Sequence, residues 1–136
     1  MDAEHTFASA QVADISLPQD WREHAGRRGL LLIFIHGPWC HHCLEHLLWL
    51  RRKHAWLAER GVGSLAVSGG DASQIEAFQQ SLWTPLPFAL IAGDESARSA
   101  TLLVDRAGAP HLSRSEEHRL PDQTTLLGCI ERMPAS

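Results

Sequence analysis

The feature that most constrains the fold of this chain is the continuous apolar run LLLIFI at residues 30–35. A run of this length without polar alternation is typical of a β-strand that is buried on both faces. Such a strand needs packing partners above and below it, which a sheet flanked by helices provides. With 136 residues and 44% hydrophobic side chains, the chain can supply that core. We therefore expect an α/β protein with this strand inside it.

The segments that follow repeat the strand–helix pattern. Gly37 and Pro38 end the first strand, and a long helix is expected from about Cys40 to Arg60, with Gly61 as its stop. The further expected elements are a strand at 64–68, a helix at 72–82 capped by Asp71, a hairpin of strands 101–105 and 109–112 around Gly108, and a helix from Asp122 to about Met133. This order predicts a mixed sheet of about four to five strands flanked by helices, with the first two strands parallel.

Three stretches have weaker patterns. Residues 16–26 predict a short helix, and residues 1–15 an irregular N-terminal segment. Residues 83–100 have no clear period, although PFALI is a candidate strand and DESARS a candidate helical turn. Among the remaining residues we expect core or groove walls for Trp49, Trp56 and Trp83, a small buried hydrophobe for Cys129, and surface positions for His54, His111 and His118.

Length and composition indicate one domain over residues 1–136. The longest apolar run has the length of a strand and not of a membrane span, and Asp2 and Glu4 stand where a signal peptide carries basic residues. We therefore expect a cytoplasmic protein without a membrane partner. The net charge of −4 also argues against nucleic acid as a partner, because phosphate binding requires clustered positive charge.

Two of the three cysteines, Cys40 and Cys43, form a Cys-X-X-Cys pair just after the first strand, where the long helix begins. The free N–H groups and the dipole at a helix N-terminus stabilise a thiolate there. The two-residue spacer brings the second sulfur one turn further along, near enough to close a small disulfide ring. We expect Cys40 to be the exposed nucleophile and Cys43 to be the more buried resolving thiol.

The spacer residues of the pair are His41 and His42. A protonated histidine beside a thiolate stabilises it, which favours the dithiol and makes the disulfide more oxidising. We expect a tuning role for at least one of the two, the alternative being that both are solvated spacers.

The stretch GPWCHHC, with Trp39 directly before the first cysteine, resembles the active site of the thioredoxin superfamily. The blocks LLLIFIHGPWCHHCLEHL, GVGSLAVSGGDASQIEAFQQ, LPFALIAGD and TLLVDRAG are similar, in order, to its redoxin branch, which includes the peroxiredoxin-like and alkyl-hydroperoxide-reductase/thiol-specific-antioxidant proteins. The resemblance covers about residues 17–113. It implies a thioredoxin-like fold and thiol–disulfide exchange through a redox-active Cys40–Cys43 disulfide, with no bound cofactor.

The resemblance also implies partners and contact residues. The partners would be a disulfide-containing protein or a small thiol or disulfide, together with an external reductant. A proline loop opposite the dithiol contacts the substrate in this family. Thioredoxin spacing would place that loop at Pro85 and Pro87, whereas redoxin spacing places it near Ser99-Ala100, where the chain has no proline. We favour the redoxin register because residues 101–112 make the better hairpin. The expected substrate-contact residues are Trp39, Pro38, Pro85 and Pro87.

The chain departs from the family pattern at two positions near the dithiol. Gly37 stands where peroxiredoxins carry a Thr or Ser, three residues before the cysteine that attacks peroxide, which argues against a dedicated peroxidase. Phe34 stands where thioredoxins carry a buried acid, so deprotonation of Cys43 lacks its usual assistant. His36 is the nearest candidate for that role and is expected, with His41 and His42, to tune the dithiol.

A metal site is the competing interpretation of the same cluster. His42, Cys43 and His46 can share one helix face, and His36 or Cys40 could complete a set of nitrogen and sulfur ligands suited to zinc or copper. All of these ligands would come from one segment, which is unusual for structural zinc. The sequence thus predicts a thiol–disulfide oxidoreductase. The alternatives are a peroxiredoxin-like thiol peroxidase and a non-enzymatic copper- or zinc-binding module.

Overall fold

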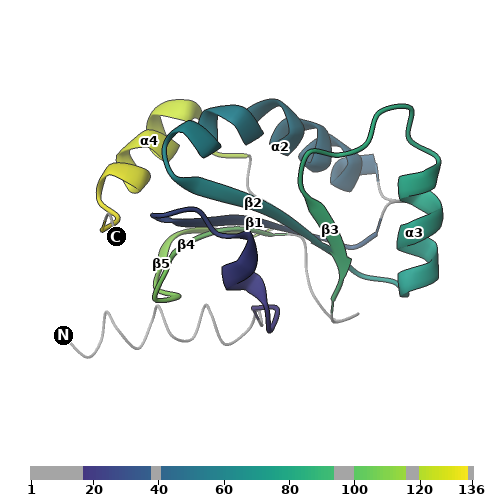
Figure 1. Ribbon diagram of the computed structural model, residues 1–136. Coiled ribbons are helices and arrows are strands. Elements are labelled where there is room, and N and C mark those ends of the chain that lie inside the picture. The colour runs from purple at the N-terminus through teal and green to yellow at the C-terminus, as the bar shows by residue number, and fades with distance from the viewer. Residues whose placement is uncertain (1–16, 38–40, 94–99, 116–119, 135–136) are drawn as a thin grey trace.

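The computed structural model describes residues 17–37, 41–93, 100–115 and 120–134, which form a five-stranded mixed sheet with helices packed against it (Figure 1). The elements are η1 (Trp21–His24), β1 (Gly29–Ile35), α2 (His41–Glu59), β2 (Val62–Ser68), α3 (Ala72–Gln80), β3 (Ala89–Ala92), β4 (Ala100–Asp105), β5 (Pro110–Ser115) and α4 (Gln123–Glu131). The strand order across the sheet is β3-β2-β1-β4-β5. The predicted α/β class, with a mixed sheet flanked by helices, is confirmed.

Strand β1 is the centre of the sheet, and all seven of its residues are buried. It pairs in parallel with β2, from Gly29 beside Val62 to Ile35 beside Ser68, and antiparallel with β4, from Gly29 beside Asp105 to Phe34 beside Ala100. The expectation of a strand buried on both faces is therefore correct.

The side chains of β1 divide the core into two clusters, because successive residues of a strand point to opposite faces. Leu31, Ile33 and Ile35 belong to the larger cluster, which includes residues of α2 and α4. Leu30, Leu32 and Phe34 belong to the second cluster, with Trp21 of η1. In Figure 1, α2 and α4 lie over one face of the sheet and η1 lies against the other.

Local sequence signals account for most of the observed boundaries. Gly61, with a φ of 81°, follows α2, and the Asp71 side chain accepts from the Gln74 N–H in a capping box that begins α3. Asp122 caps α4 by accepting from the Thr125 N–H. In the described part of the chain, no helix is long and apolar enough to cross a membrane.

The candidate strand in PFALI is confirmed, since Ala89–Ala92 form the edge strand β3 beside β2. The structure differs from expectation in two places. The short helix predicted at 16–26 is reduced to the single 3-10 turn η1. Trp83 was expected in the core or a groove wall, but it is fully exposed and lies in the connection between α3 and β3. Residues 1–15 and the DESARS segment lie outside the described residues.

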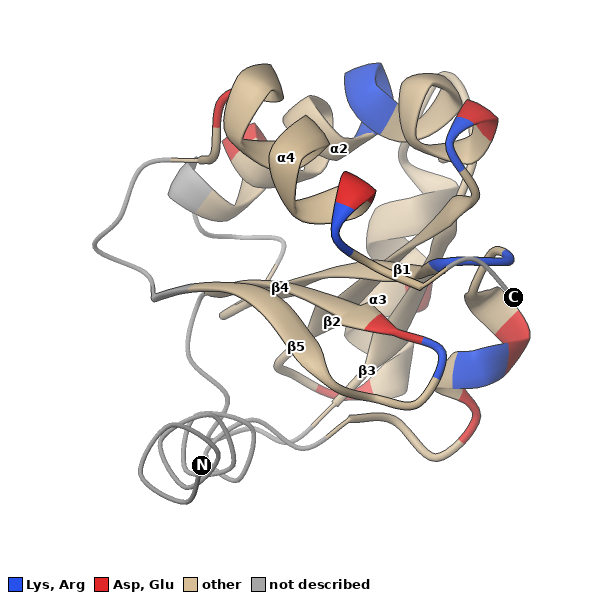
Figure 2. Ribbon diagram, turned by 90° about the vertical axis from the view of Figure 1, so that its left-hand side faces the viewer, with Lys and Arg blue, Asp and Glu red and all other residues tan. Residues whose placement is uncertain are grey.

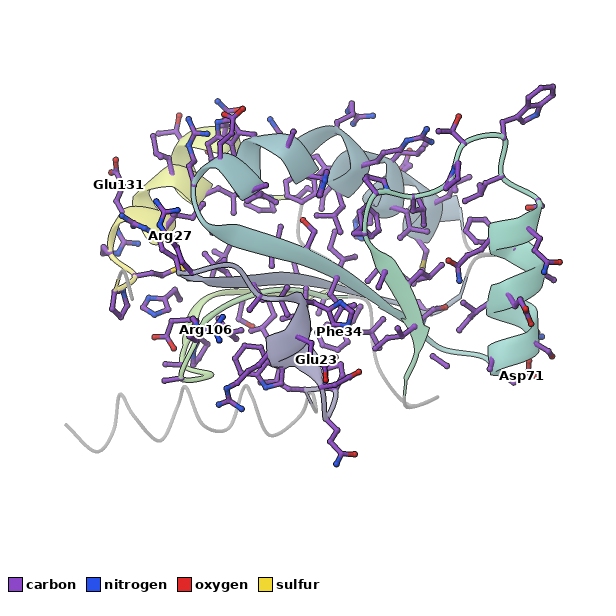
Figure 3. All side chains as sticks on the ribbon, in the orientation of Figure 1. Glu23, Arg27, Phe34, Asp71, Arg106 and Glu131 are labelled. Atoms are coloured by element: carbon purple, nitrogen blue, oxygen red, sulfur yellow. The ribbon has the colours of Figure 1, made fainter. Side chains whose placement is uncertain are left out.

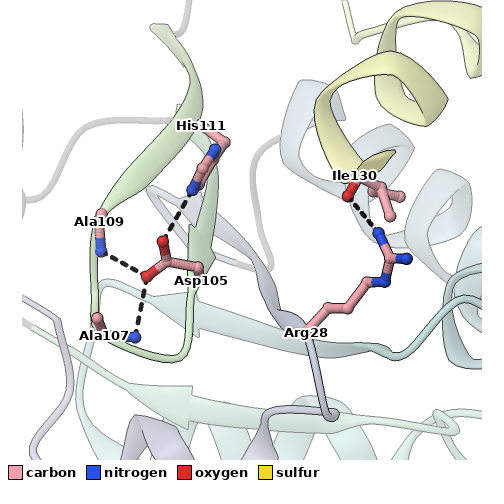
Figure 4. A network of polar contacts seen from close by, with 6 residues as sticks. All are labelled: Arg28, Asp105, Ala107, Ala109, His111 and Ile130. Carbon is pink, nitrogen blue, oxygen red and sulfur yellow. Dashed lines mark hydrogen bonds and ion pairs between the residues drawn. The ribbon is translucent and has the colours of Figure 1, made fainter. Parts of the chain in front are cut away.

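Figure 2 shows most Lys, Arg, Asp and Glu residues on the helices and connecting turns. Asp105, at the end of β4, is buried. Its Oδ1 accepts the N–H groups of Ala107 at 2.9 Å and Ala109 at 3.0 Å, and its Oδ2 lies 2.9 Å from Nε2 of His111 (Figure 4). Burial raises the pKa of Asp105, but these hydrogen bonds outweigh it and the net pKa is lowered. His111 is thus a partly buried partner of Asp105, and the prediction of an ordinary surface histidine is wrong.

We expect Asp105→Ala to lower the free energy of unfolding by about 1–3 kcal/mol, because it leaves two N–H groups of the β4–β5 turn without their acceptor. Urea unfolding at neutral pH measures this change. Asp105→Asn is the control, since its amide oxygen still accepts from both N–H groups, and it should cost less. An equal loss in both variants would contradict the role assigned to Oδ1.

The lowered pKa of Asp105 also predicts a pH dependence. A carboxyl with a folded-state pKa below its ordinary value of 3.8 stabilises the fold fully above that value. The contribution is lost as pH falls through the lower, folded-state pKa. The difference in unfolding free energy between the unmodified protein and Asp105→Asn should therefore shrink as the pH falls below about 4. A difference that persists unchanged to pH 2 would contradict this assignment.

Candidate functional site

The dithiol motif lies at the carboxyl end of β1, where the chain leaves the central strand and enters α2. Ile35 is the last residue of β1, and α2 begins at His41. Pro38, Trp39 and Cys40 lie outside the described residues, as do the side chains of His41 and His42. The buried strand and the helix predicted on either side of the motif are both present.

Cys43 is the member of the pair that the structure describes. It is the third residue of α2, its side chain is fully buried, and it belongs to the larger core cluster. Its Sγ accepts a hydrogen bond from the backbone N–H of His36, with 3.3 Å between the nitrogen and the sulfur. The first turn of α2 contains no acidic residue, so no carboxylate there opposes a negative charge on sulfur. This arrangement suits a thiol that reacts only with a neighbouring sulfur.

The carboxyl ends of the three parallel strands are joined by backbone hydrogen bonds. The N–H of Gly69, directly after β2, donates to the carbonyl of Ile35 at 3.0 Å. The N–H of Gly93, directly after β3, donates to the carbonyl of Ser68 at 2.8 Å. This edge of an open α/β sheet is where such folds place their reactive groups.

The structure shows where Phe34 and Gly37, the two residues that depart from the family pattern, lie. Phe34 is buried in the cluster on the η1 side of the sheet (Figure 3), whereas Cys43 lies in the cluster on the α2 side. A side chain at position 34 therefore points away from Cys43. Gly37 is buried and offers no hydroxyl to the turn. His36 contacts Cys43 through its backbone N–H, while its side chain is exposed.

The proline positions can be compared with the sheet topology. Pro85 and Pro87 are exposed and lie in the connection to β3, which pairs with β2 and not with β1. The strand antiparallel to β1 begins at Ala100, in agreement with the redoxin register. No peptide bond among the described residues is cis. The substrate-contact roles of the four predicted residues stay predictions.

The metal interpretation gains no support from the described side chains. Among them, no group of three His, Cys, Asp or Glu residues is arranged to hold a metal ion. Of the proposed ligands, His42 has no described side chain, and His46 is partly buried. Zinc or copper binding at this cluster therefore stays a prediction from the sequence.

Cys129 is separate from the motif in sequence and lies in α4, with an exposed fraction of 4%. A guanidinium nitrogen of Arg132 lies 3.5 Å from its sulfur. Because it packs in the larger core cluster, the prediction of a small buried hydrophobe is correct.

A concave region of about 530 Å³ lies at the opposite end of β1, where Figure 3 shows Arg27 and Glu131. It is lined by Arg27, Arg28, Glu59, Arg60, Leu127, Ile130 and Glu131. Arg28 donates to the carbonyl of Ile130 at 2.7 Å, and Arg60 donates to the carbonyl of Trp56 at 3.0 Å. These bonds satisfy carbonyls near the C-terminal ends of α4 and α2, so we interpret the arginines as structural.

Several solved structures have a fold similar to that of this chain. A thiol:disulfide interchange protein DsbE from Chlorobium tepidum is 18% identical, with a TM-score of 0.59 over 79% of this chain and 83% of that one. AhpC from Mycobacterium tuberculosis is 14% identical, with a TM-score of 0.64 over 85% and 72%. Peroxidoxin BcpB from the same organism is 11% identical, with a TM-score of 0.64 over 87% and 86%.

Neither the protein-family models nor the curated protein sequences give a match to this chain. The structural likeness therefore establishes the fold. The chain has the thioredoxin-like fold that these three structures share.

The burial of two cysteines predicts the outcome of alkylation. Treatment of the reduced, native protein with iodoacetamide should give a single adduct at Cys40, because Cys43 and Cys129 are 0% and 4% exposed. Intact mass and peptide mapping measure this. The denatured protein, in which all three cysteines should react, is the control. Labelling of Cys43 as fast as that of Cys40 would contradict the assigned roles.

Proposed function

We propose that the protein is a thiol–disulfide oxidoreductase in which Cys40 is the nucleophile and Cys43 the resolving thiol. The observation that carries the proposal is the position of Cys43. It is fully buried one turn into the helix that follows the central strand, and its sulfur accepts a hydrogen bond from the His36 N–H. A sulfur so enclosed is unsuited to attack an external substrate but suited to attack one at Cys40.

The proposed reaction has two steps. The Cys40 thiolate attacks one sulfur of a substrate disulfide, forming a mixed disulfide and releasing the other sulfur as a thiolate. Cys43, having lost its proton to solvent, then attacks the Cys40 sulfur. The Cys40–Cys43 bond forms, the bond to substrate breaks, and the departing thiolate takes a proton from water. The substrate is reduced by two electrons, and the pair is oxidised.

The pair would be returned to its dithiol form by an external thiol reductant, and the cycle needs no bound cofactor. The substrate would be a disulfide-containing protein or a small disulfide. His41 and His42, as spacer residues, would stabilise the Cys40 thiolate when protonated. A cytoplasmic location fits this use of cysteine, because the pair would act catalytically and not as a structural disulfide.

Peroxide is the second candidate oxidant, because proteins with the same fold include AhpC and peroxidoxin BcpB. In that case the Cys40 thiolate would attack a peroxide oxygen, forming a sulfenic acid, and Cys43 would displace water from it. Gly37 argues against this reaction, since it supplies no hydroxyl near the attacked oxygen.

The two cysteine variants test the proposed exchange. Reaction of Cys43→Ser with 5,5′-dithiobis(2-nitrobenzoate) should release one equivalent of thionitrobenzoate and leave the other bound to Cys40, because the resolving thiol is absent. Cys40→Ser should lose reduction of insulin disulfides. Absorbance and intact mass measure both results.

Cys129→Ser is the matched control and should release two equivalents, as the unmodified protein does. Retained insulin reduction in Cys40→Ser would contradict the proposal. Oxidation of the pair by micromolar peroxide faster than by disulfides would favour the peroxidase instead.

A further inference from the structure

The structure links three backbone positions to the resolving sulfur: Gly69, the Ile35–His36 peptide, and Cys43. We propose that residue 36 is a positioning residue that acts through its backbone N–H, that Gly69 fixes this N–H in place, and that the N–H stabilises the Cys43 thiolate as it attacks the mixed disulfide. The inference rests on the proposed function and identifies the group that takes the place of the missing buried acid.

The first link is the contact between the ends of β1 and β2. The Gly69 N–H donates to the Ile35 carbonyl at 3.0 Å. A Cβ atom at Gly69 would lie 2.5 Å from the His36 carbonyl oxygen, closer than real Cβ contacts allow. Any larger residue would push the His36 backbone away, so glycine is required for this approach.

The second link is the hydrogen bond to sulfur. Strand β1 ends at Ile35, so the N–H of His36 lies beyond the described strand pairs and is available to Cys43 Sγ at 3.3 Å. Because Cys43 is fully buried, this donor takes the place of the water that would solvate an exposed thiolate. Hydrogen bonding to the charged form of a buried group favours that form, which offsets part of the desolvation cost of a buried thiolate.

Neither of the two side chains considered for this role offers the same support. Phe34 is apolar and lies on the opposite face of the sheet, and the His36 side chain is exposed. The sequence pointed to the His36 imidazole as the assistant of Cys43. The geometry assigns the assistance to the backbone of the same residue.

The step concerned is resolution. The Cys43 thiolate donates its electron pair to the Cys40 sulfur, the Cys40–Cys43 bond forms, and the substrate leaves as a thiolate. The N–H donor acts on Cys43 before this bond forms and has no part in the first attack by Cys40. Its loss should therefore slow the second step alone.

The test compares His36→Pro with His36→Ala, which both lack the imidazole while only the proline variant lacks the N–H. In the reaction with 5,5′-dithiobis(2-nitrobenzoate), the first equivalent of thionitrobenzoate reports attack by Cys40 and the second reports resolution by Cys43. We expect resolution in His36→Pro to be about three- to fifteenfold slower than in His36→Ala, and the first step to be equal in the two. Loss of a charge-assisted hydrogen bond lowers the fraction of Cys43 present as thiolate and so slows resolution. The thiolate that does form is more basic and a better nucleophile, which offsets part of the slowing and gives this range.

If the proline variant fails to fold, the test uses a chain in which lactic acid replaces the alanine at position 36 of His36→Ala. It replaces the N–H with an oxygen atom and adds no bulk. We expect the same selective slowing of resolution.

Gly69 is tested by Gly69→Ala against Gly63→Ala. The second substitution also forces a Cβ onto a backbone carbonyl, that of His24, but at the opposite end of β2. Both should lower the unfolding midpoint, whereas only Gly69→Ala should slow resolution, by about threefold or more.

Equal resolution rates in the variants with and without the N–H would overturn the inference, as would equal rates in Gly69→Ala and Gly63→Ala. The proposed function would survive that result if Cys43→Ser still retains thionitrobenzoate on Cys40. Failure of the proposed function itself would appear as the release of both equivalents of thionitrobenzoate in the reaction of Cys43→Ser.

Discussion

The pairing of β1 on both of its edges, with both of its faces buried, is the constraint on which the rest of the structure depends. The strand is parallel to β2 on one side and antiparallel to β4 on the other, and its alternate side chains enter two different core clusters. Because no residue of β1 is exposed to solvent, residues that react with an external substrate have to lie beyond the end of the strand. The turn after Ile35 is therefore the natural position for the dithiol.

Much of the fold could be predicted because its signals are local. The apolar run at 30–35 identified β1, Asp71 and Asp122 marked two helix starts, and Gly61 marked a helix end. The surface position expected for His111 is wrong because Asp105 holds its ring across the hairpin turn. The candidate strand in PFALI is confirmed, but its pairing with β2 depends on residues that are distant in sequence. No periodicity encodes either contact.

The candidate site also contains one feature that the sequence predicts and others that it does not. Cys-X-X-Cys spacing predicted a buried second thiol, and Cys43 is fully buried. The sequence could not show that the N–H of His36 would reach its sulfur, since backbone donors leave no trace in residue identity. Gly69 has a weak signal, a glycine pair after a buried strand, but this fits an ordinary turn equally well. Only the close approach to His36 distinguishes the two.

The link from Gly69 through Ile35 and His36 to Cys43 lies within one continuous strand–helix–strand unit, residues 29–69. The residues in these contacts are closer together in sequence than those paired between β1 and β4, such as Phe34 and Ala100. Loop closure costs more entropy for longer loops, so contacts of low sequence separation tend to form first. The support for the resolving sulfur can thus assemble during folding before the antiparallel half of the sheet has docked. A nascent chain would then hold its second thiol in place before the pairing of β1 with β4 is complete.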